Sequence, residues 1–263
     1  MKLISFDIES DFGFFRKPES NNTLNVSYNI IHRPAVLGIL GAIIGLEGYK
    51  EKGEFPEYYK RLNHLKIGIA PLEHEQGNYL KTPIKYSNTV GYANKDGANK
   101  GTTFLTEELT LIAPKYRIYL LLVLDNEDEV LLFNNLKNKK SEYIPYFGKN
   151  EFTAWWSNFV EYDFSEVNSE SHLVGKLNSL FVRNQIIKDN VEKGSSSFLD
   201  IIDADDFDEI TFIYFERLPV DFDLKLTQYQ IKEMVYTNYK IKNLENLPDL
   251  YYLKNLDSYV QLI

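Results

Sequence analysis

Histidine is the side chain best suited to acid–base catalysis near neutral pH, and the chain contains four histidines. They are His32, His64, His74 and His172. No two of them have the HxH, HxxxH or HExxH spacing that brings two imidazoles to one metal ion. The sequence therefore predicts no metal site, and a single histidine with a basic neighbour is the simplest histidine chemistry to consider.

Nucleophilic and nucleotide-dependent chemistry lack a recognisable motif. The chain has no cysteine, which removes thiolate catalysis, disulfides and thiolate metal ligands. It has no G-x-S-x-G elbow and no G-x-x-x-x-G-K-[ST] loop, and Gly38, Gly41 and Gly45 do not form a G-x-G-x-x-G pattern. We therefore expect no catalytic residue of these classes and no cofactor.

Two groups of carboxylates could serve acid–base chemistry or bind a cation. Asp7 and Glu9 lie on the polar side of an alternating strand pattern, so we expect solvent exposure rather than a catalytic acid pair. The second group comprises six carboxylates between residues 200 and 209. It lacks the glycine and the distal glutamate of an EF-hand loop, which favours a solvated loop over a cation site.

The elements that must position these groups begin with a strand over Lys2–Glu9. A polar, aromatic loop or irregular hairpin over residues 11–31 leads to a helix that opens at Pro34 and covers Ala35–Leu46. The small residues of this helix recur at three-to-four spacing, which we attribute to close packing rather than to phosphate binding. The next expected elements are a helix over Phe55–Leu62 and strands over Leu65–Ala70, Leu105–Leu111, Tyr116–Leu124 and Val130–Phe133.

The last two of these strands are joined by the acidic turn Asp125–Glu129 and are expected to form a hairpin. Strand, helix, strand and returning hairpin is the order of a ferredoxin-like α+β sheet, which RNA-recognition modules also use. Residues 73–101 interrupt this order with almost no aliphatic side chains. An interruption of this length in a compact chain usually has a function or is disordered.

The sequence after residue 142 is predicted to be mainly β. Residues 188–209 contain Gly194-Ser195-Ser196-Ser197 and the whole acidic group, so we expect a mobile loop there. The expected elements are a short helix over Glu151–Val160 and strands near Leu180–Asn184, Ile210–Phe215, Tyr229–Tyr236 and Ser258–Leu262.

The net charge of −9 averages over two different halves of the 263-residue chain. Residues 1–120 hold 15 Lys and Arg against 13 Asp and Glu, a net of +2, whereas residues 121–263 hold 14 against 25, a net of −11. Residues 1–120 could therefore bind a phosphate group, even though the net charge of the whole chain is negative. The longest apolar run, Ala35–Leu46, is too short to cross a membrane, so we expect a cytoplasmic protein without a membrane partner.

Four separated segments together match the pattern of one known protein family. They are FFRKP at 14–18 with NNT at 21–23, RPAVLGILGAIIGL at 33–46, PKYRIYL at 114–120 and YFGKNEF at 146–152. Their order and distances resemble the fifth CRISPR-associated (Cas) protein family, a subunit of type I Cascade surveillance complexes. With FERLP at 215–219, the chain looks most like subtype I-B.

The resemblance implies a ferredoxin-like (RRM-like) N-terminal domain of the RAMP superfamily over residues 1–140, with an inserted thumb at about 73–103, and a small β-rich C-terminal domain over 141–263. It implies a ribonucleoprotein subunit for antiviral defence that caps the 5′ handle of the CRISPR RNA. Its other partners would be a Cas-seven-type backbone subunit, a Cas-eight-type large subunit and, indirectly, target DNA. The residues assigned to the RNA are Arg16, Lys17, Asn22, Tyr28, His32 and Arg33 beside the first helix, and Lys81, Lys85, Tyr86, Asn88, Lys95 and Lys100 on the thumb.

One subfamily, that of subtype I-C, cuts precursor RNA with a tyrosine and an adjacent lysine and histidine. This chain has no Lys-His dipeptide and has Lys115-Tyr116-Arg117 in the nearby strand, so the resemblance implies a non-catalytic subunit here. Two alternatives stay open. One is a metal-independent ribonuclease that uses His32 with a lysine or arginine neighbour, and the other is a protein-only adaptor with the acidic C-terminal half as its interface.

Overall fold

The computed structural model describes residues 1–19, 24–88, 104–168, 172–186, 201–203 and 211–263. Its central sheet has four strands in the order β5-β8-β1-β9, and every neighbouring pair is antiparallel. The strands are β1 (Lys2–Glu9), β5 (Lys66–Leu72), β8 (Lys115–Leu122) and β9 (Trp155–Tyr162), and the crossing helices are α1 (Arg33–Ile44) and α3 (Glu127–Lys137). The chain thus runs β-α-β-β-α-β, the connectivity expected of a ferredoxin-like unit.

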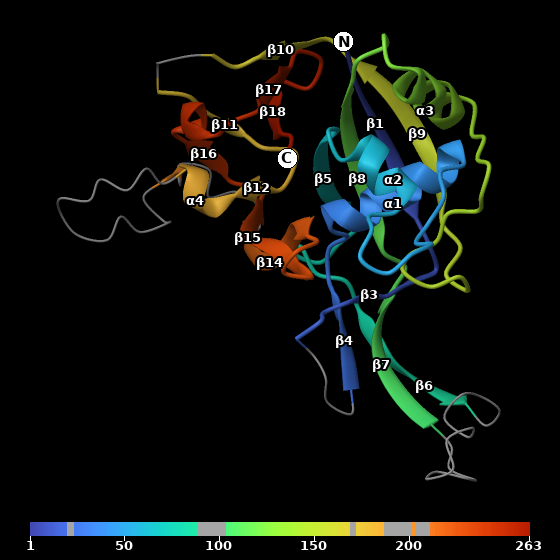
Figure 1. The fold of residues 1–263 in the computed structure, drawn as a ribbon. Helices are drawn as coiled ribbons and strands as arrows, with labels where there is room; N and C mark the ends of the chain where they lie inside the picture. The colour runs from blue at the N-terminus through green and yellow to red at the C-terminus, as the bar shows by residue number, and fades with distance from the viewer. Residues whose placement is uncertain (20–23, 89–103, 169–171, 187–200, 204–210) are drawn as a thin grey trace.

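Both faces of this sheet are buried. Figure 1 shows α1, α2 (Glu57–Leu62) and α3 on one face. Ile4, Phe6 and Ile8 of β1 belong to the core on that side, and Leu3 belongs to a second apolar cluster that includes the last strands of the chain. β1 is therefore buried on both faces from Leu3 to Ile8 rather than half-buried, because the C-terminal half covers the side of the sheet opposite to the helices.

The expected exposure of Asp7 was wrong for this reason. Asp7 is 2% exposed, and its carboxylate accepts hydrogen bonds from Arg117 Nε at 2.6 Å, Arg117 Nη2 at 2.9 Å and Asn158 Nδ2 at 2.9 Å. Arg117 is its cross-strand neighbour on β8, so the register of the sheet makes the pair. Glu9, at the end of the strand, stays partly exposed and lies 3.4 Å from Lys115 Nζ.

A second sheet projects from the body as an arm formed by β4, β6 and β7 (Figure 1). β6 (Lys81–Asn88) pairs antiparallel with β7 (Phe104–Ile112), and β4 (Leu24–Tyr28) runs parallel along β7. The side chains of residues 81–87 are exposed or half-buried, which explains why this stretch has so few aliphatic residues. The thumb expected at about 73–103 overlaps β6, and residues 89–103 lie outside the described part of the chain.

Short strands join the arm to the body. They are β2 (Phe12–Gly13), which pairs with β7, and β3 (Phe15–Arg16), which pairs with β4. The loop over residues 146–149 is held against them, since Phe14 N–H donates to the Phe147 carbonyl at 3.0 Å. Gly148 has φ +81°, and a Cβ on it would lie 1.9 Å from the Phe14 carbonyl oxygen, so only glycine fits there.

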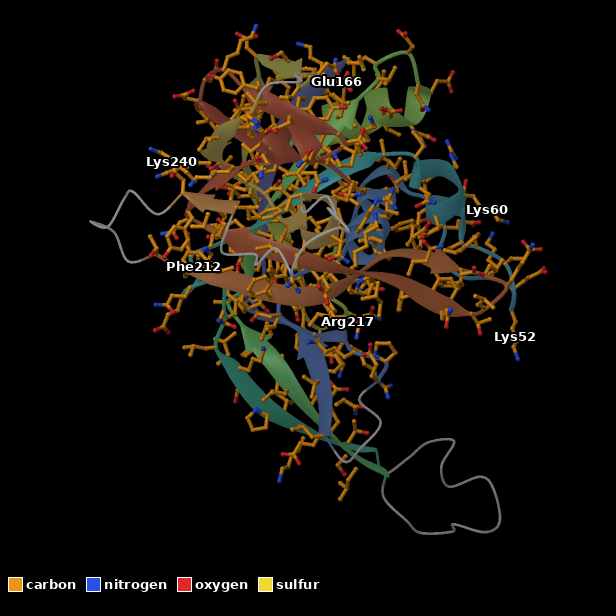
Figure 2. All side chains as sticks on the ribbon, turned by 90° about the vertical axis from the view of Figure 1, so that its left-hand side faces the viewer. Lys52, Lys60, Glu166, Phe212, Arg217 and Lys240 are labelled. Atoms are coloured by element: carbon orange, nitrogen blue, oxygen red, sulfur yellow. The ribbon has the colours of Figure 1, made fainter. Side chains whose placement is uncertain are left out.

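The second half of the described chain is mainly β, and the predicted mixed α+β class is confirmed. Three small sheets follow the orders β12-β15-β14, β10-β17-β18 and β11-β16-β13. Their elements are β10 (Phe164–Glu166), β11 (Val174–Lys176), β12 (Phe181–Val182), α4 (Arg183–Ile186), β13 (Ile202–Asp203), β14 (Ile213–Asp223), β15 (Gln228–Thr237), β16 (Lys240–Lys242), η3 (Leu244–Asn246), β17 (Leu250–Leu253) and β18 (Ser258–Gln261). Figure 2 shows the β14–β15 hairpin lying across the root of the arm.

Two predicted elements have the wrong type. The strand expected at Val130–Phe133 lies inside α3, because Asn126 Oδ1 accepts from Asp128 N–H at 2.9 Å and caps that helix. The acidic stretch is thus a helix start, where carboxylates are favourable, and not a hairpin turn. The helix expected at Glu151–Val160 is instead the edge strand β9, which pairs with β1 and lies beyond the boundary set at residue 140.

Other predicted elements differ only at their ends. α1 stops at Ile44, since Gly45 is its left-handed C-cap with φ +82°. A Cβ on Gly41 would lie 2.4 Å from Tyr58 Cβ, which supports the packing interpretation of this glycine. β5 continues through Pro71, because β5 is an edge strand and tolerates a missing N–H. Most of the expected loop over residues 188–209 lies outside the described residues.

Candidate nucleic-acid interface

A cleft of about 530 Å³ opens where the arm meets the body, and we refer to it as the arm-base cleft. Its size is typical of a site that holds one small ligand or part of a larger one. The cleft is lined by Phe14, Phe15, Arg16, His32, Pro34, Ala35, Tyr49, Tyr58, Tyr59, Glu108, Gly148, Lys149, Phe222 and Tyr229. Aromatic rings with a few cations are the combination that binds single-stranded nucleic acid.

The two cations of the arm-base cleft differ in their partners. Arg16 is exposed at the end of β3 and forms no ion pair within the described ranges. Lys149 forms an ion pair with Glu108, and its Nζ lies 3.7 Å from the centre of the Tyr86 ring. Arg16 is therefore available to a phosphate, whereas Lys149 also ties the body to the arm.

His32 lies at the N-terminus of α1 and forms part of the cleft wall. Its Nδ1 accepts a hydrogen bond from Ala35 N–H at 3.2 Å, which caps the helix. The ring is 7% exposed and packs edge-on against Phe15 and Tyr28. Burial lowers the pKa of His32 to about 4, so the ring is neutral at physiological pH.

This environment predicts a pH-dependent contribution to stability. Because the folded pKa of His32 lies below its ordinary value of 6.5, the contribution is complete above pH 6.5 and is lost as the pH falls through about 4. His32→Asn keeps a capping acceptor but does not titrate. We expect the difference in free energy of unfolding between wild type and His32→Asn to shrink by up to about 3 kcal/mol between neutral pH and pH about 4, measured by urea unfolding. Parallel pH profiles would contradict the burial of a neutral ring.

Lys17, Tyr28 and Lys81 gather around a buried carboxylate, Glu216, rather than in the cleft. Glu216 accepts from the N–H groups of Asn29 and Ile30 at 3.1 Å each and pairs with Lys17 Nζ at 2.9 Å. Lys17 also lies over the Tyr28 ring at 5.0 Å, and burial lowers the pKa of Lys81 while Glu216 partly offsets this. This cluster attaches the β14–β15 hairpin to the root of the arm.

Arg33 is engaged inside the protein. Its Nε donates to the Ile263 carbonyl at 3.0 Å, Nη1 to Asn63 Oδ1 at 2.7 Å, and Nη2 to the Leu65 carbonyl at 3.0 Å. Burial lowers the pKa of its guanidinium. Through these contacts Arg33 connects α1 to the residues after α2 and to Ile263. Its guanidinium therefore has few N–H groups left to bind a phosphate.

The remaining assigned residues lie on the arm or outside the described chain. Lys85 is exposed, 3.9 Å from Glu107, and Tyr86 stacks under Lys149 at the side of the arm that faces the loop over residues 146–149. Asn88 is the last described residue of β6. The structure thus brings Arg16 and His32 into one cleft and distributes Lys17, Tyr28, Arg33, Lys81, Lys85 and Tyr86 over other sites. Asn22, Lys95 and Lys100 lie outside the described residues.

Several residues of the cleft were not predicted from the sequence. Glu108 and Lys149 come from β7 and from the loop after residue 145, and Tyr49, Phe222 and Tyr229 come from three other places in the chain. The motif YFGKNEF contains Lys149, so this lysine could have been assigned to the RNA site from the sequence. No local pattern indicates that Phe222 and Tyr229, near the tip of the β14–β15 hairpin, reach α1.

Neither a protein-family model nor a curated protein matches the chain. Similar solved structures include a chain of a CRISPR RNA-guided surveillance complex, 11% identical, with a TM-score of 0.46, over 90% of this chain and 91% of that one. A CRISPR protein from Archaeoglobus fulgidus is 13% identical, with a TM-score of 0.46, over 98% of each chain. A type III-B Cmr-beta complex bound to cognate target RNA and AMPPnP has a chain that is 12% identical, with a TM-score of 0.47, over 92% of this chain and 86% of that one. At this level the matches describe likeness and carry no argument about activity.

Two further properties can be stated for the described ranges. None of their helices combines the length and the apolar character needed to cross a membrane. Within the same ranges, no three histidine or carboxylate side chains are grouped so that they could hold a metal ion.

Proposed function

We propose that this chain is a non-catalytic, RNA-binding subunit of a type I CRISPR Cascade complex, of subtype I-B, that binds the 5′ handle of the CRISPR RNA. Its protein partners would be a Cas-seven-type backbone subunit and a Cas-eight-type large subunit, and it would meet target DNA only indirectly. The four sequence segments that resemble the fifth Cas family support the family assignment. No cofactor is part of the proposal.

The arm-base cleft is the observation that carries the RNA-binding proposal. It combines an exposed arginine, Arg16, with a wall of aromatic rings at the foot of a projecting arm. Splayed bases stack on such rings, while arginine and lysine hold the phosphates between them. Lys115 and Arg117, in the same half of the chain, are less available than Arg16, since both are paired with carboxylates.

The surroundings of His32 support the non-catalytic part of the proposal. A general base needs a pKa near the working pH and access to the proton that it removes. His32 is buried, its pKa is lowered to about 4, and its Nδ1 already accepts the capping hydrogen bond. A residue held in this way is a poor activator of a 2′-hydroxyl.

The phosphate contact of Arg16 can be tested by the salt dependence of RNA binding. For a repeat-derived RNA that carries the handle, Arg16→Ala should weaken binding several-fold and lower the slope of log affinity against log salt by about one. Fluorescence anisotropy between about 50 and 200 mM salt measures both quantities. The chain alone and the co-expressed complex should both be used, because partner subunits could complete the site.

Lys254→Ala is the matched control for Arg16→Ala. Lys254 is an exposed cation in the turn between β17 and β18, which Figure 1 places at the end of the body opposite to the arm. Its removal should leave the slope unchanged. Equal slopes for all three proteins would contradict a phosphate contact of Arg16, and no binding at low salt in either preparation would leave only the adaptor hypothesis.

The ribonuclease alternative requires a separate measurement. Purified protein incubated with repeat RNA in the presence of EDTA should leave the RNA intact. Clean, site-specific products would overturn the non-catalytic proposal, and loss of those products in His32→Asn would assign the cleavage to His32.

A further inference from the structure

The six arginines of the chain all lie in its described part, and they differ in their partners. Four of them bind oxygen atoms of the protein, and these are Arg33, Arg61, Arg117 and Arg183. The other two, Arg16 and Arg217, are exposed, and within the described ranges their side chains form no ion pair and no hydrogen bond. Arginine binds phosphate through a planar fork of N–H donors, so an arginine without a protein partner is free to make such a contact.

Both of these arginines lie at the root of the arm. Arg16 ends β3, which pairs with β4 of the arm, and it lines the arm-base cleft. Figure 2 shows Arg217 where the β14–β15 hairpin crosses the root of the arm. β14 also carries Phe222, which lines the cleft five residues further along the strand. Because a strand rises about 3.4 Å per residue, Arg217 lies about 17 Å along β14 from this part of the cleft.

The alternation and the register of β14 explain why Arg217 has no partner. The preceding residue, Glu216, is buried, so the side chain of Arg217 points to the opposite, exposed face of the strand. The residue directly across from Arg217 on β15 is Glu233, and an opposite charge in that position usually forms a pair. Glu233 instead pairs with Arg183 at 3.0 Å. The guanidinium of Arg217 therefore keeps its donors for a ligand.

Tyr28 connects the surroundings of Arg217 to the cleft. Burial, with the charges of Glu19 and Glu216, raises the pKa of Tyr28, and the positive charge of Arg217 opposes this rise. The guanidinium is thus within electrostatic range of the phenol. The Tyr28 ring packs edge-on against the ring of His32, with 5.4 Å between the ring centres, and His32 lines the cleft. Arg217 therefore lies beside the cleft wall, on the outer side of the hairpin.

We propose that Arg217 is a second phosphate contact for the RNA, and that the strand leaves the arm-base cleft along β14 across the root of the arm. Arg16 holds a phosphate at the cleft, and Arg217 holds another farther along the RNA. This inference rests on the proposed RNA-binding function and adds to it a direction for the RNA and a residue outside the cleft. A phosphate contact positions RNA without reading its bases, so Arg217 contributes no base preference.

The salt dependence of RNA binding tests the second contact. For a repeat-derived RNA that carries the handle, Arg217→Ala should weaken binding several-fold and lower the slope of log affinity against log salt by about one. The double variant of Arg16→Ala with Arg217→Ala should lower the slope about twice as much, because two separate phosphates lose a cation. Fluorescence anisotropy with the chain alone and with the co-expressed complex measures these slopes.

The length of the RNA tests its direction. Arg16→Ala should weaken the binding of every oligouridine, including the shortest one that binds, because Arg16 lines the cleft itself. Arg217→Ala should leave the shortest oligouridine unaffected and weaken only longer ones, since about 17 Å of strand separates Arg217 from Phe222. An effect of Arg217→Ala that is the same at every length would overturn the proposed path.

Arg61→Ala is the matched control, because it removes the same formal charge from another exposed arginine. The guanidinium of Arg61 is already paired with Asp128 and Glu57, and it does not line the cleft. This variant should keep the wild-type slope. Thermal unfolding shows whether each variant is folded, and Arg217→Gln, which keeps most of the side-chain length, replaces Arg217→Ala if the alanine variant is not. Arg217→Lys keeps the charge and should retain most of the slope.

The outcomes separate this inference from the proposed function. A wild-type slope for Arg217→Ala with a lowered slope for Arg16→Ala overturns the second contact and leaves the RNA-binding proposal intact. An equal fall in Arg61→Ala and Arg217→Ala also overturns it, since net charge alone would then explain both. Loss of a partner subunit at an unchanged slope overturns it and assigns Arg217 to a protein interface. No RNA binding by the chain or by the co-expressed complex overturns both proposals together.

Discussion

Gly148→Ala is expected to lower the free energy of unfolding by about 4 kcal/mol or more, which is exceptional for one added methyl group. Two costs combine. Alanine in the left-handed conformation costs about 1–2 kcal/mol, and the new Cβ would lie 1.9 Å from the Phe14 carbonyl oxygen. That oxygen belongs to backbone, so the loop must separate from β2 and β3. Urea unfolding monitored by circular dichroism measures the loss.

Gly53→Ala separates the cost of the left-handed conformation from the cost of the steric clash with Phe14. Gly53 has φ +86°, close to the +81° of Gly148, but a Cβ on Gly53 would have no heavy atom within 4 Å. Its substitution should cost only the conformational contribution, about 1–2 kcal/mol. The close approach of the loop to Phe14 would be contradicted if the two variants were destabilised equally.

Asp7→Asn is expected to cost about 3 kcal/mol, the lower end of the range for one partner of a buried ion pair. The lower end applies because the side chain of Arg117 is 29% exposed and keeps some hydration. An asparagine amide would present an N–H group to a guanidinium that needs acceptors. The hydrogen bonds of Asp7 also raise the pKa of Arg117, so the guanidinium cannot shed its charge to relieve the loss.

Glu9→Gln is the control on the same strand. Glu9 is partly exposed and lies 3.4 Å from Lys115 Nζ, which also has Glu73 as a partner. Surface pairs of this kind contribute about 0–1 kcal/mol, so the variant should unfold close to wild type. A cost for Asp7→Asn no larger than that for Glu9→Gln would show that the central pair does not stabilise the sheet.

The fold could be predicted from the sequence where the pattern is local. Alternation identified β1, and Pro34 with the small-residue spacing identified α1, because both depend on residues within one element. The errors at α3 and β9 have a common cause. Val130–Phe133 and Glu151–Val160 are short and contain apolar residues compatible with either type, so their state depends on the helix cap at Asn126 and on pairing with β1.

The cleft was less predictable than the fold. Arg16 and His32 were assigned from the family resemblance, whereas Glu108, Phe222 and Tyr229 enter the site only through tertiary packing. The burial of Asp7 was missed for the same reason, since an alternating strand pattern does not say whether a second layer covers its polar face. Contacts between distant segments carry no periodic pattern in a single sequence.

The long sequence separation within the arm-base cleft has a consequence for synthesis of the protein. A chain that has left the ribosome as far as β9 already contains all four strands of the central sheet. The cleft still lacks Phe222 and Tyr229 at that stage, because both belong to the later β14–β15 hairpin. Nascent or prematurely terminated chains can therefore build the sheet without offering a complete cleft, and the RNA binding that we propose would then favour full-length molecules over fragments.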